Sequence, residues 1–171
     1  MPKIIENAKE QLLHEAKRQI SENGYAKTTI RSVASACGLG VGTVYNYFGS
    51  KDMLIASFML EDWQRCLSEM ISPTEESSEE ALRRVYLSLS SFTETYSSLF
   101  CDRDAAKVFA TASTERHSLL RKQLADVITP LCKHSDSPFL AEFIAESLLT
   151  WTLSGRSFPE IYSVVKLLLE K

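Results

Sequence analysis

The feature that most constrains this chain is a pair of short helical patterns separated by glycine near the N-terminus. Apolar residues recur in the first pattern at the spacing of one helical face, namely Ile30, Val33, Ala34 and Cys37. Gly38 follows at once, where glycine can end a helix in the left-handed conformation. Val44 and Phe48 then form an inward pair for a helix over about 41–47. The sequence therefore predicts two short helices joined by a tight turn.

Helical periodicity continues over longer stretches of the chain. Proline and glycine are sparse, and we find no alternating strand pattern and no repeat. We expect a first helix over about 3–22, ended by Gly24, and a helix capped by Ser50 that runs from Lys51 to about Ile71. Further helices are expected over about 79–99, 113–132 (ended or kinked by Pro130), 137–154 (with Pro138 in its first turn) and 159–169. The predicted fold class is all-α, with about nine helices.

Composition restricts the class of protein. With 44% hydrophobic residues the chain can bury a sizeable core, and no apolar run approaches the ~18 residues of a membrane helix. Charges stand near the N-terminus where a signal peptide would be apolar, so we expect a cytoplasmic protein without a membrane partner. The cysteines are dispersed, which favours free and mostly buried thiols, with redox sensing as the alternative: Cys37, Cys66, Cys101 and Cys132.

Charge is distributed unevenly along the chain. Residues 1–51 carry seven basic and four acidic side chains, a formal charge of +3, whereas the remainder carries −6. A basic N-terminal part on an acidic body is expected if only that part meets a polyanion. The difference is small and supports a nucleic-acid partner only mildly.

Two short helices about a glycine turn are the pattern of a helix-turn-helix, whose second helix enters a DNA major groove ~12 Å wide. Residues 24–54 resemble the DNA-binding region of the TetR (tetracycline-repressor-like) family. The matching elements are Gly24-Tyr25, Thr28-Thr29-Ile30-Arg31, Val33-Ala34, Gly38-Leu39, Gly42-Thr43-Val44-Tyr45, Tyr47-Phe48, Ser50-Lys51 and Leu54. The resemblance implies a DNA-binding domain over 1–50 and a helical regulatory and dimerisation domain over 51–171.

The resemblance also implies roles for individual side chains. Thr29 and Arg31 would contact a phosphate or a base edge, and Tyr45 and Tyr47 would donate to phosphates. Lys51 would contact phosphate at the start of its helix, whose backbone N–H groups add donors. The complete expected DNA-binding set is Thr28, Thr29, Arg31, Gly40, Val41, Gly42, Thr43, Tyr45, Asn46, Tyr47 and Lys51.

Two positions depart from the family pattern. Gly40 stands where the family often has a capping serine, so a hydroxyl contact to phosphate is lost. Val41 cannot hydrogen-bond but can contact a thymine methyl group. We hypothesise that Val41 favours a thymine in each half-site, which an unchanged operator preference in Val41→Ala would contradict.

By family analogy, the last two helices form a four-helix bundle with a second subunit. A homodimer would also read two half-sites ~34 Å apart. Two apolar stripes are available for this interface, although core burial explains part of both: Phe143, Ile144, Leu148 and Trp151, and Ile161, Val164, Val165, Leu168 and Leu169.

An effector pocket would lie between the middle helices. The candidates are aromatic with little charge, which favours a small apolar or aromatic effector, and plain core packing is the alternative for each. They are Tyr86, Phe92, Tyr96, Phe109, His117 and Trp151.

The resemblance thus implies a ligand-responsive homodimer that represses transcription from a palindromic double-stranded DNA operator. Two other interpretations remain open, a TetR-like regulator without a small-molecule effector and a helical enzyme. No nucleophile–base pair, metal cluster or phosphate-binding glycine loop supports the enzyme, and no cofactor or metal is expected.

Overall fold

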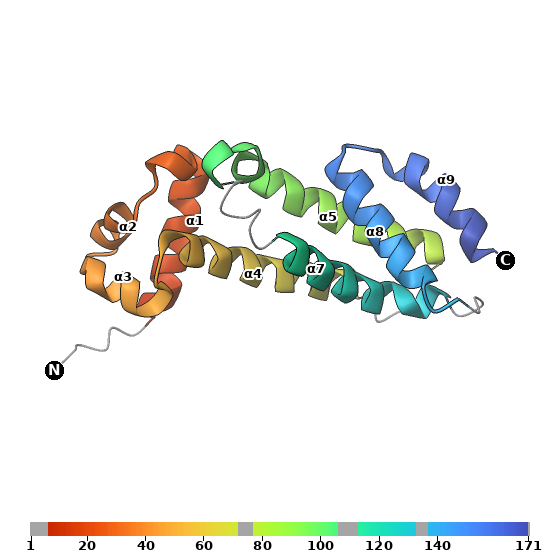
Figure 1. Ribbon diagram of the computed structural model, residues 1–171, viewed down its shortest axis with the longest axis horizontal. Helices are drawn as coiled ribbons and strands as arrows, with labels where there is room; N and C mark the ends of the chain where they lie inside the picture. The colour runs from red at the N-terminus through yellow and green to blue at the C-terminus, as the bar shows by residue number, and fades with distance from the viewer. Residues whose placement is uncertain (1–6, 72–76, 106–112, 133–136, 171) are drawn as a thin grey trace. The chain divides into compact units, whose positions relative to one another are not determined.

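The computed structural model describes residues 7–71, 77–105, 113–132 and 137–170 (Figure 1). The described residues are mostly helical and include no strand, so the all-α prediction is confirmed. The helices are α1 (Ala8–Lys27), α2 (Ile30–Ala36), α3 (Val41–Phe48), α4 (Lys51–Met70), α5 (Ser78–Cys101), α7 (Ser113–Ile128), the short 3-10 helix η1 (Thr129–Cys132), α8 (Leu140–Leu153) and α9 (Phe158–Leu169).

Glycine and proline set several of the boundaries. Gly24 interrupts α1 with a φ of 77° and a ψ of 174°, and Gly38 has a φ of 67° just after α2. Both torsions belong to the region that glycine enters without steric cost. Pro130 lies in η1 directly after α7, so it ends that helix as predicted.

The predicted start of α8 is wrong by three residues. The helix begins at Leu140, and Pro138 lies in the turn that precedes it. The Leu140 N–H donates to the Ser137 carbonyl at 3.2 Å, a bond of the tighter i to i+3 type. Regular α-helical bonding begins only with Phe143, whose N–H donates to the Phe139 carbonyl.

The chain forms two compact units. Unit 1 contains residues 1–62 and 96–110, and unit 2 contains residues 63–95 and 111–171. These compact units divide α4 and α5, whereas the expected domain boundary at residue 50 precedes α4 and stays a prediction. The first half of α4 belongs to unit 1 because its apolar side chains Leu54, Ile55 and Phe58 are buried there.

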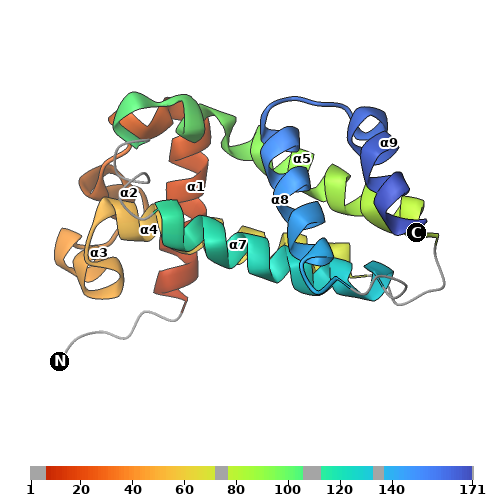
Figure 2. The ribbon, with the colours of Figure 1, turned by 45° about the vertical axis from the view of Figure 1, so that its right-hand side comes forward.

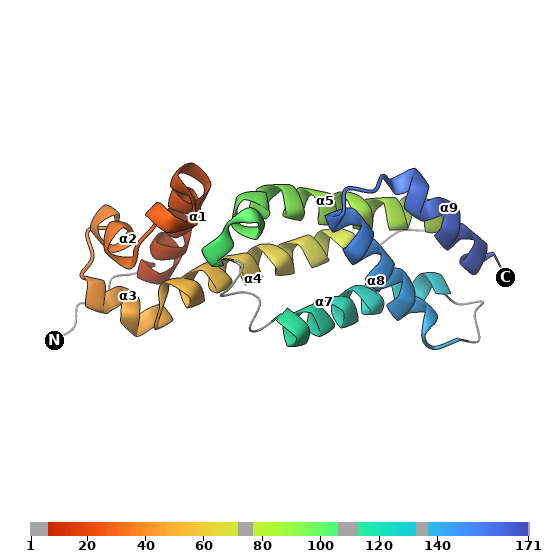
Figure 3. The same cartoon turned by 45° about the horizontal axis from the view of Figure 1, so that its top comes forward.

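Unit 1 contains the three N-terminal helices, which Figure 3 shows grouped together. Their inner faces carry side chains that are almost fully buried, and burial of such groups is the main favourable term in folding. The buried apolar side chains of α1 to α3 are Ala8, Leu12, Leu13, Ala16, Ile20, Tyr25, Ile30, Val33, Ala34, Val44 and Phe48.

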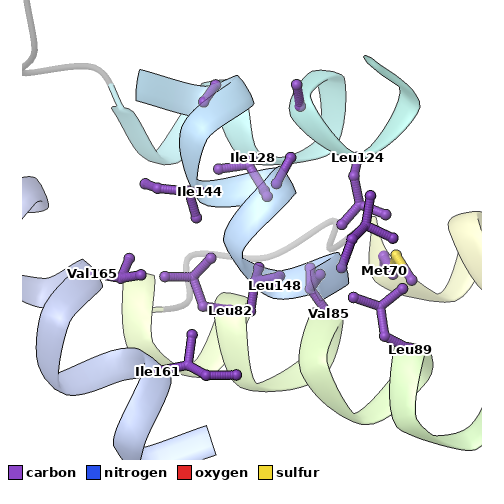
Figure 4. Close-up of a cluster of buried hydrophobic side chains, with 14 of the residues drawn as sticks. Met70, Leu82, Val85, Leu89, Leu124, Ile128, Ile144, Leu148, Ile161 and Val165 are labelled. Atoms are coloured by element: carbon purple, nitrogen blue, oxygen red, sulfur yellow. The ribbon is translucent and has the colours of Figure 1, made fainter. Parts of the chain in front are cut away.

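Unit 2 has its own hydrophobic core, built from the end of α4 and from α5, α7, α8 and α9 (Figure 4). Figure 2 shows α7 lying alongside α8. The core is filled by apolar side chains that include Met70, Leu82, Val85, Leu89, Leu124, Ile128, Ile144, Leu148, Ile161 and Val165. Of the helices that the structure describes, none combines the length and the apolar character needed to cross a membrane.

Candidate nucleic-acid interface

The turn between α2 and α3 is closed by a double backbone contact. The Leu39 N–H donates to the Ala34 carbonyl at 2.8 Å, and the Gly38 N–H donates to the Ser35 carbonyl at 3.1 Å. This pair of bonds is the Schellman arrangement, which requires a left-handed residue at the position that Gly38 occupies. The angle at which α3 leaves α2 is therefore fixed by backbone hydrogen bonds.

The two faces of α3 differ sharply. Val44 is 0% exposed and Phe48 6% exposed, so these two side chains anchor the helix to the rest of unit 1. Gly42 and Asn46 lie about half a turn from this anchor and are exposed. The predicted inward pair of this helix agrees with the structure.

Two tyrosines flank the outward face of α3. Tyr45 is 51% exposed and Tyr47 is 47% exposed, and their positions in the helix place them on opposite sides of Asn46. Thr43 is half-buried and lies on the Tyr47 side. The helix thus presents a small centre with a phenol on each flank.

The two positions that depart from the family pattern lie at the start of α3. Gly40 caps the helix through its backbone alone, and its carbonyl accepts a 2.9 Å hydrogen bond from the Thr43 N–H. Val41 is half-buried at the first helical position. Only part of the Val41 side chain is therefore available for contact with a partner.

The threonines before α2 have different environments. Thr28 is buried and donates its hydroxyl to the Gly24 carbonyl at 2.9 Å, so it stabilises the loop rather than facing outward. Thr29 is exposed and caps α2, accepting from the Ser32 N–H at 3.0 Å, while the Ser32 hydroxyl accepts from the Thr29 N–H. Arg31 is exposed on the first turn of α2.

A polar network that the sequence patterns did not reveal holds this cap against α1. The Ser32 hydroxyl lies 2.6 Å from Oε1 of Gln19, and Gln19 donates through Nε2 to Glu15 at 2.7 Å. Arg18 donates to both carboxylate oxygens of Glu15. The hydrogen bonds from Arg18 and Gln19 lower the pKa of Glu15 to about 2, because they stabilise its charged form.

Lys51 is engaged within unit 1. Its Nζ donates to the Tyr25 carbonyl at 2.8 Å and lies 3.5 Å from the centroid of the Tyr25 ring. Burial lowers the pKa of Lys51, and the nearby carboxylate of Asp52 opposes that shift. The prediction that Lys51 contacts phosphate therefore concerns a side chain that already has partners in the free protein.

The expected dimer interface divides into buried and exposed residues. Ile144, Leu148, Ile161 and Val165 are buried in the core of unit 2, and Leu168 packs against that core, so the chain's own packing explains them. Six large apolar residues of α8, its N-cap and α9 are exposed, and three of them, Phe139, Leu153 and Leu167, are absent from the predicted stripes; the six are Phe139, Phe143, Trp151, Leu153, Val164 and Leu167.

A cavity of about 410 Å³ opens between the exposed faces of α8 and α9. Phe143 and Trp151 line it from α8, and Val164 lines it from α9. Arg156 and Glu160, which are paired at 3.1 Å, place charges in its wall. The surface thus combines exposed aromatic side chains with a local hollow.

The expected effector-binding residues that the structure describes have different surroundings, and a shared pocket stays a prediction. Tyr86 donates to the Arg156 carbonyl at 3.1 Å and packs on Phe158, while Trp151 lies on the surface of α8. Tyr96 belongs to unit 1, and Phe109 lies outside the described residues.

His117 and Phe92 each have a defined partner in unit 2. Nε2 of His117 lies 2.8 Å from the Glu146 carboxylate, and Phe92 meets the edge of Trp63 with ring centroids 5.4 Å apart. Burial raises the pKa of Glu146, but hydrogen bonds from His117 and Thr150 outweigh it and the pKa is lowered.

Only one of the four cysteines is buried, which contradicts the expectation of mostly buried thiols. Cys66 is buried, Cys37 and Cys132 are half-buried, and Cys101 is exposed at the end of α5. All four are free. Cys37 follows the last residue of α2, where its Sγ lies 3.6 Å from the Gln11 carbonyl, so its helical spacing did not place it in the core.

Comparison with known proteins agrees with the geometry of unit 1. Residues 12–58 match the family of bacterial regulatory proteins described as tetR. The HTH-type transcriptional regulator UidR of Escherichia coli (strain K12) is 33% identical over 64 residues, which are 37% of this chain and 33% of UidR. The HTH-type transcriptional repressor AcnR of Corynebacterium glutamicum is 32% identical over 66 residues, which are 39% of this chain and 35% of AcnR. These matches span only about a third of each relative's length.

Solved structures extend the likeness in fold over nearly the whole chain. Salmonella enterica GusR has a TM-score of 0.72 at 18% identity and covers 95% of both chains. Thermus thermophilus FadR, a TetR-family transcriptional repressor in complex with lauroyl-CoA, has a TM-score of 0.61 at 20% identity, covering 94% of this chain and 92% of its own. The relatives are transcriptional regulators, in agreement with the prediction that the chain is not an enzyme. Together with the helix-turn-helix of unit 1, these matches show that residues 12–58 are similar to the DNA-binding region of the tetR family of bacterial regulatory proteins, and that the chain shares the fold of these solved structures.

Proposed function

We propose that the protein is a transcriptional repressor that binds a palindromic operator with α3 in the major groove of each half-site. The division of α3 carries this proposal. Its inner face is anchored by Val44 and Phe48, while its outer face is exposed and small at Gly42. A Cβ atom added to Gly42 would meet nothing within 4 Å, so the fold itself does not require glycine there. Close approach to a base pair would explain it.

The geometry supports a distinct role for each part of the interface. Asn46 stands at the centre of the exposed face, where an amide can pair with an adenine edge. Tyr45 and Tyr47 flank it with hydroxyl groups that can donate to phosphates. Thr29 and Arg31, exposed at the start of α2, would add a capped helix start and a guanidinium to the proposed interface.

A gel-shift titration tests the DNA part of the proposal. Duplexes are selected from a random pool by the wild-type protein, and binding to the enriched duplex is measured at several salt concentrations. Phosphate contacts predict an affinity that falls steeply with salt. Asn46→Ala should weaken binding by about tenfold or more, because one bidentate base contact is lost.

The matched control for Asn46→Ala is Gln64→Ala, which removes an exposed amide from α4 outside unit 1. This variant should bind like the wild type. Failure to enrich any duplex, or equal binding by both variants, would contradict the proposed interface.

We also propose that two copies associate through the exposed faces of α8 and α9. Val164 is 58% exposed, Trp151 is 48% exposed, and both line the hollow between these helices. Exposed aromatic and apolar side chains that gather around a hollow are typical of interaction sites. A second copy is the partner that a palindromic operator requires.

Analytical ultracentrifugation tests the association. Val164→Glu should shift the protein towards monomer, because a carboxylate would be buried without a partner. Leu60→Glu is the control, since Leu60 is a similarly exposed apolar residue in unit 1. A Val164→Glu protein that sediments as wild type would contradict this interface.

We further propose that a small apolar or aromatic effector binds in unit 2 and releases the DNA. The support is the apolar and aromatic interior of unit 2, where Trp63 and Phe92 pack edge to face. Trp63 and Trp151 are the two tryptophans of the chain, so Trp151→Phe leaves Trp63 as a single fluorescent reporter. An effector should change Trp63 emission and weaken DNA binding together. A compound that does one without the other would not be the effector proposed here.

A further inference from the structure

Three helices of unit 1 are joined at one carboxylate. Oδ2 of Asp62, in α4, accepts a hydrogen bond from Nζ of Lys17 at 2.5 Å. The same oxygen accepts from the hydroxyl of Tyr96, in α5. Lys17 belongs to α1, the helix that packs against α2. A single acceptor atom therefore links α1, α4 and α5.

The surroundings of this link distinguish it from a surface ion pair. Tyr96 is 2% exposed, and its ring stacks on Phe58 with centroids 6.1 Å apart. The Asp62 side chain is 14% exposed, and the Lys17 side chain is 39% exposed. Exposed ion pairs contribute little to stability, whereas hydrogen bonds to a charge that is shielded from water are stronger and more specific in geometry.

The position of the link along the helices is also informative. Asp62 is the last residue of α4 within unit 1, and Tyr96 is the first residue of α5 within unit 1. Lys17 lies on α1 only two residues before Gln19, which holds the Ser32 hydroxyl at the start of α2. The carboxylate thus joins α1 to the two residues at which α4 and α5 cross the boundary of unit 1, close in sequence to the residue of α1 that contacts the start of α2.

We propose that Asp62 is a positioning residue for DNA binding, which holds α1 against α4 and α5 through Lys17 and Tyr96 and so sets the direction in which α3 is presented. This inference rests on the proposed function, because the direction of α3 matters only when the helix-turn-helix elements of two subunits must meet two half-sites at a fixed spacing. A helix-turn-helix that is held less firmly still fits a single half-site, but the two subunits then bind both half-sites at once less often. The loss should therefore appear on a complete palindrome and not on a single half-site.

Two substitutions separate the link from general packing. Tyr96→Phe removes the hydroxyl and keeps the ring that stacks on Phe58. Tyr86→Phe is the matched control, because it removes a tyrosine hydroxyl that donates to the Arg156 carbonyl inside unit 2. Binding is measured on the palindromic duplex enriched by the wild-type protein and on a duplex that carries one half-site.

Tyr96→Phe should bind the palindrome about tenfold more weakly and the half-site within about twofold of wild type. Tyr86→Phe should match the wild type on both duplexes. Unchanged binding of the palindrome by Tyr96→Phe would overturn the inference. Equal losses of affinity on both duplexes would overturn it as well, since they would indicate a weakened fold and not a changed direction of α3.

Amide hydrogen exchange on the same proteins keeps the inference testable without DNA. In Tyr96→Phe, the amides of α1 should exchange faster than in the wild type, and in Tyr86→Phe they should not. If the wild-type protein enriches no duplex, the proposed function fails. Hydrogen exchange alone then tests whether the contacts of Asp62 hold α1 in place. Unchanged exchange in α1 would then overturn it.

Discussion

The ammonium group of Lys51 lies 3.5 Å from the centroid of the Tyr25 ring and donates a hydrogen bond to the Tyr25 carbonyl oxygen. Tyr25 donates its hydroxyl in turn to Asp52 at 2.7 Å. Residues at the start of α4 are thereby joined to the end of α1. Burial raises the pKa of Tyr25, and its hydrogen bond to Asp52 adds to that shift, so the hydroxyl remains the donor at neutral pH.

Lys51→Met tests whether this contact stabilises unit 1. The methionine keeps an apolar stem but loses the hydrogen bond and the attraction of the ammonium for the ring, so the free energy of unfolding should fall by about 1 kcal/mol. Urea unfolding measures it, with Lys27→Met as the control at an exposed lysine of α1. A Lys51→Met protein as stable as the control, but weaker on DNA, would instead leave phosphate binding as the main role of Lys51.

Gly42→Ala separates the needs of the fold from those of DNA binding. Because an added Cβ meets nothing within 4 Å, alanine should stabilise α3 by roughly 0.5–1 kcal/mol through its higher helix propensity. The same methyl group would stand on the face proposed to enter the groove, and operator affinity should fall. Thermal unfolding and gel shift are measured on the same protein. An alanine variant that is stabilised and binds DNA normally would exclude close approach at this position.

Much of unit 1 could be predicted because its signals are local. Burial of Val33, Val44 and Phe48 follows from helical spacing, and the positive φ of Gly38 follows from its place after a helix. Both signals depend only on residues close in sequence, and the structure places all four residues as expected. Thr28 shows the limit of this reasoning. A hydroxyl beside a helix start can face outward or bond to the preceding turn, and only the fold decides that it donates to the Gly24 carbonyl.

Unit 2 was less predictable because a stripe of apolar residues along a helix does not tell which neighbour covers it. Ile144 and Trp151 lie seven residues apart on α8, yet the first is 0% exposed and the second 48% exposed. The apolar surface of this helix is wide, so one side packs in the core and the other side faces solvent. Contacts between residues distant in sequence, such as Lys17 with Asp62, have no local pattern at all.

Acid should weaken unit 1 through Glu15. Its pKa of about 2 in the folded protein lies below the ordinary value of 4.5, so its contribution is present above about pH 5 and is lost as the pH falls towards 2. Glu15→Gln should lower stability at pH 7 and should show a shallower loss of stability between pH 5 and 3. Urea unfolding across this range measures both, with Glu10→Gln as the control at an exposed acid of α1. Parallel pH profiles for wild type and Glu15→Gln would contradict the assignment.

The hydrogen bond between Trp63 and Gln123 should make the stability losses from substituting these two residues smaller together than their sum. Trp63 is 3% exposed, and its Nε1–H donates to Oε1 of Gln123 at 2.9 Å. Gln123→Leu should cost about 1–3 kcal/mol, because the indole N–H is left buried without an acceptor. Adding Trp63→Phe to this variant removes the stranded donor but also loses ring area, so the second substitution should cost less than Trp63→Phe does in the wild type. Urea unfolding of the four proteins gives the coupling between the two residues. Strictly additive losses would show that the hydrogen bond contributes nothing to the stability of unit 2.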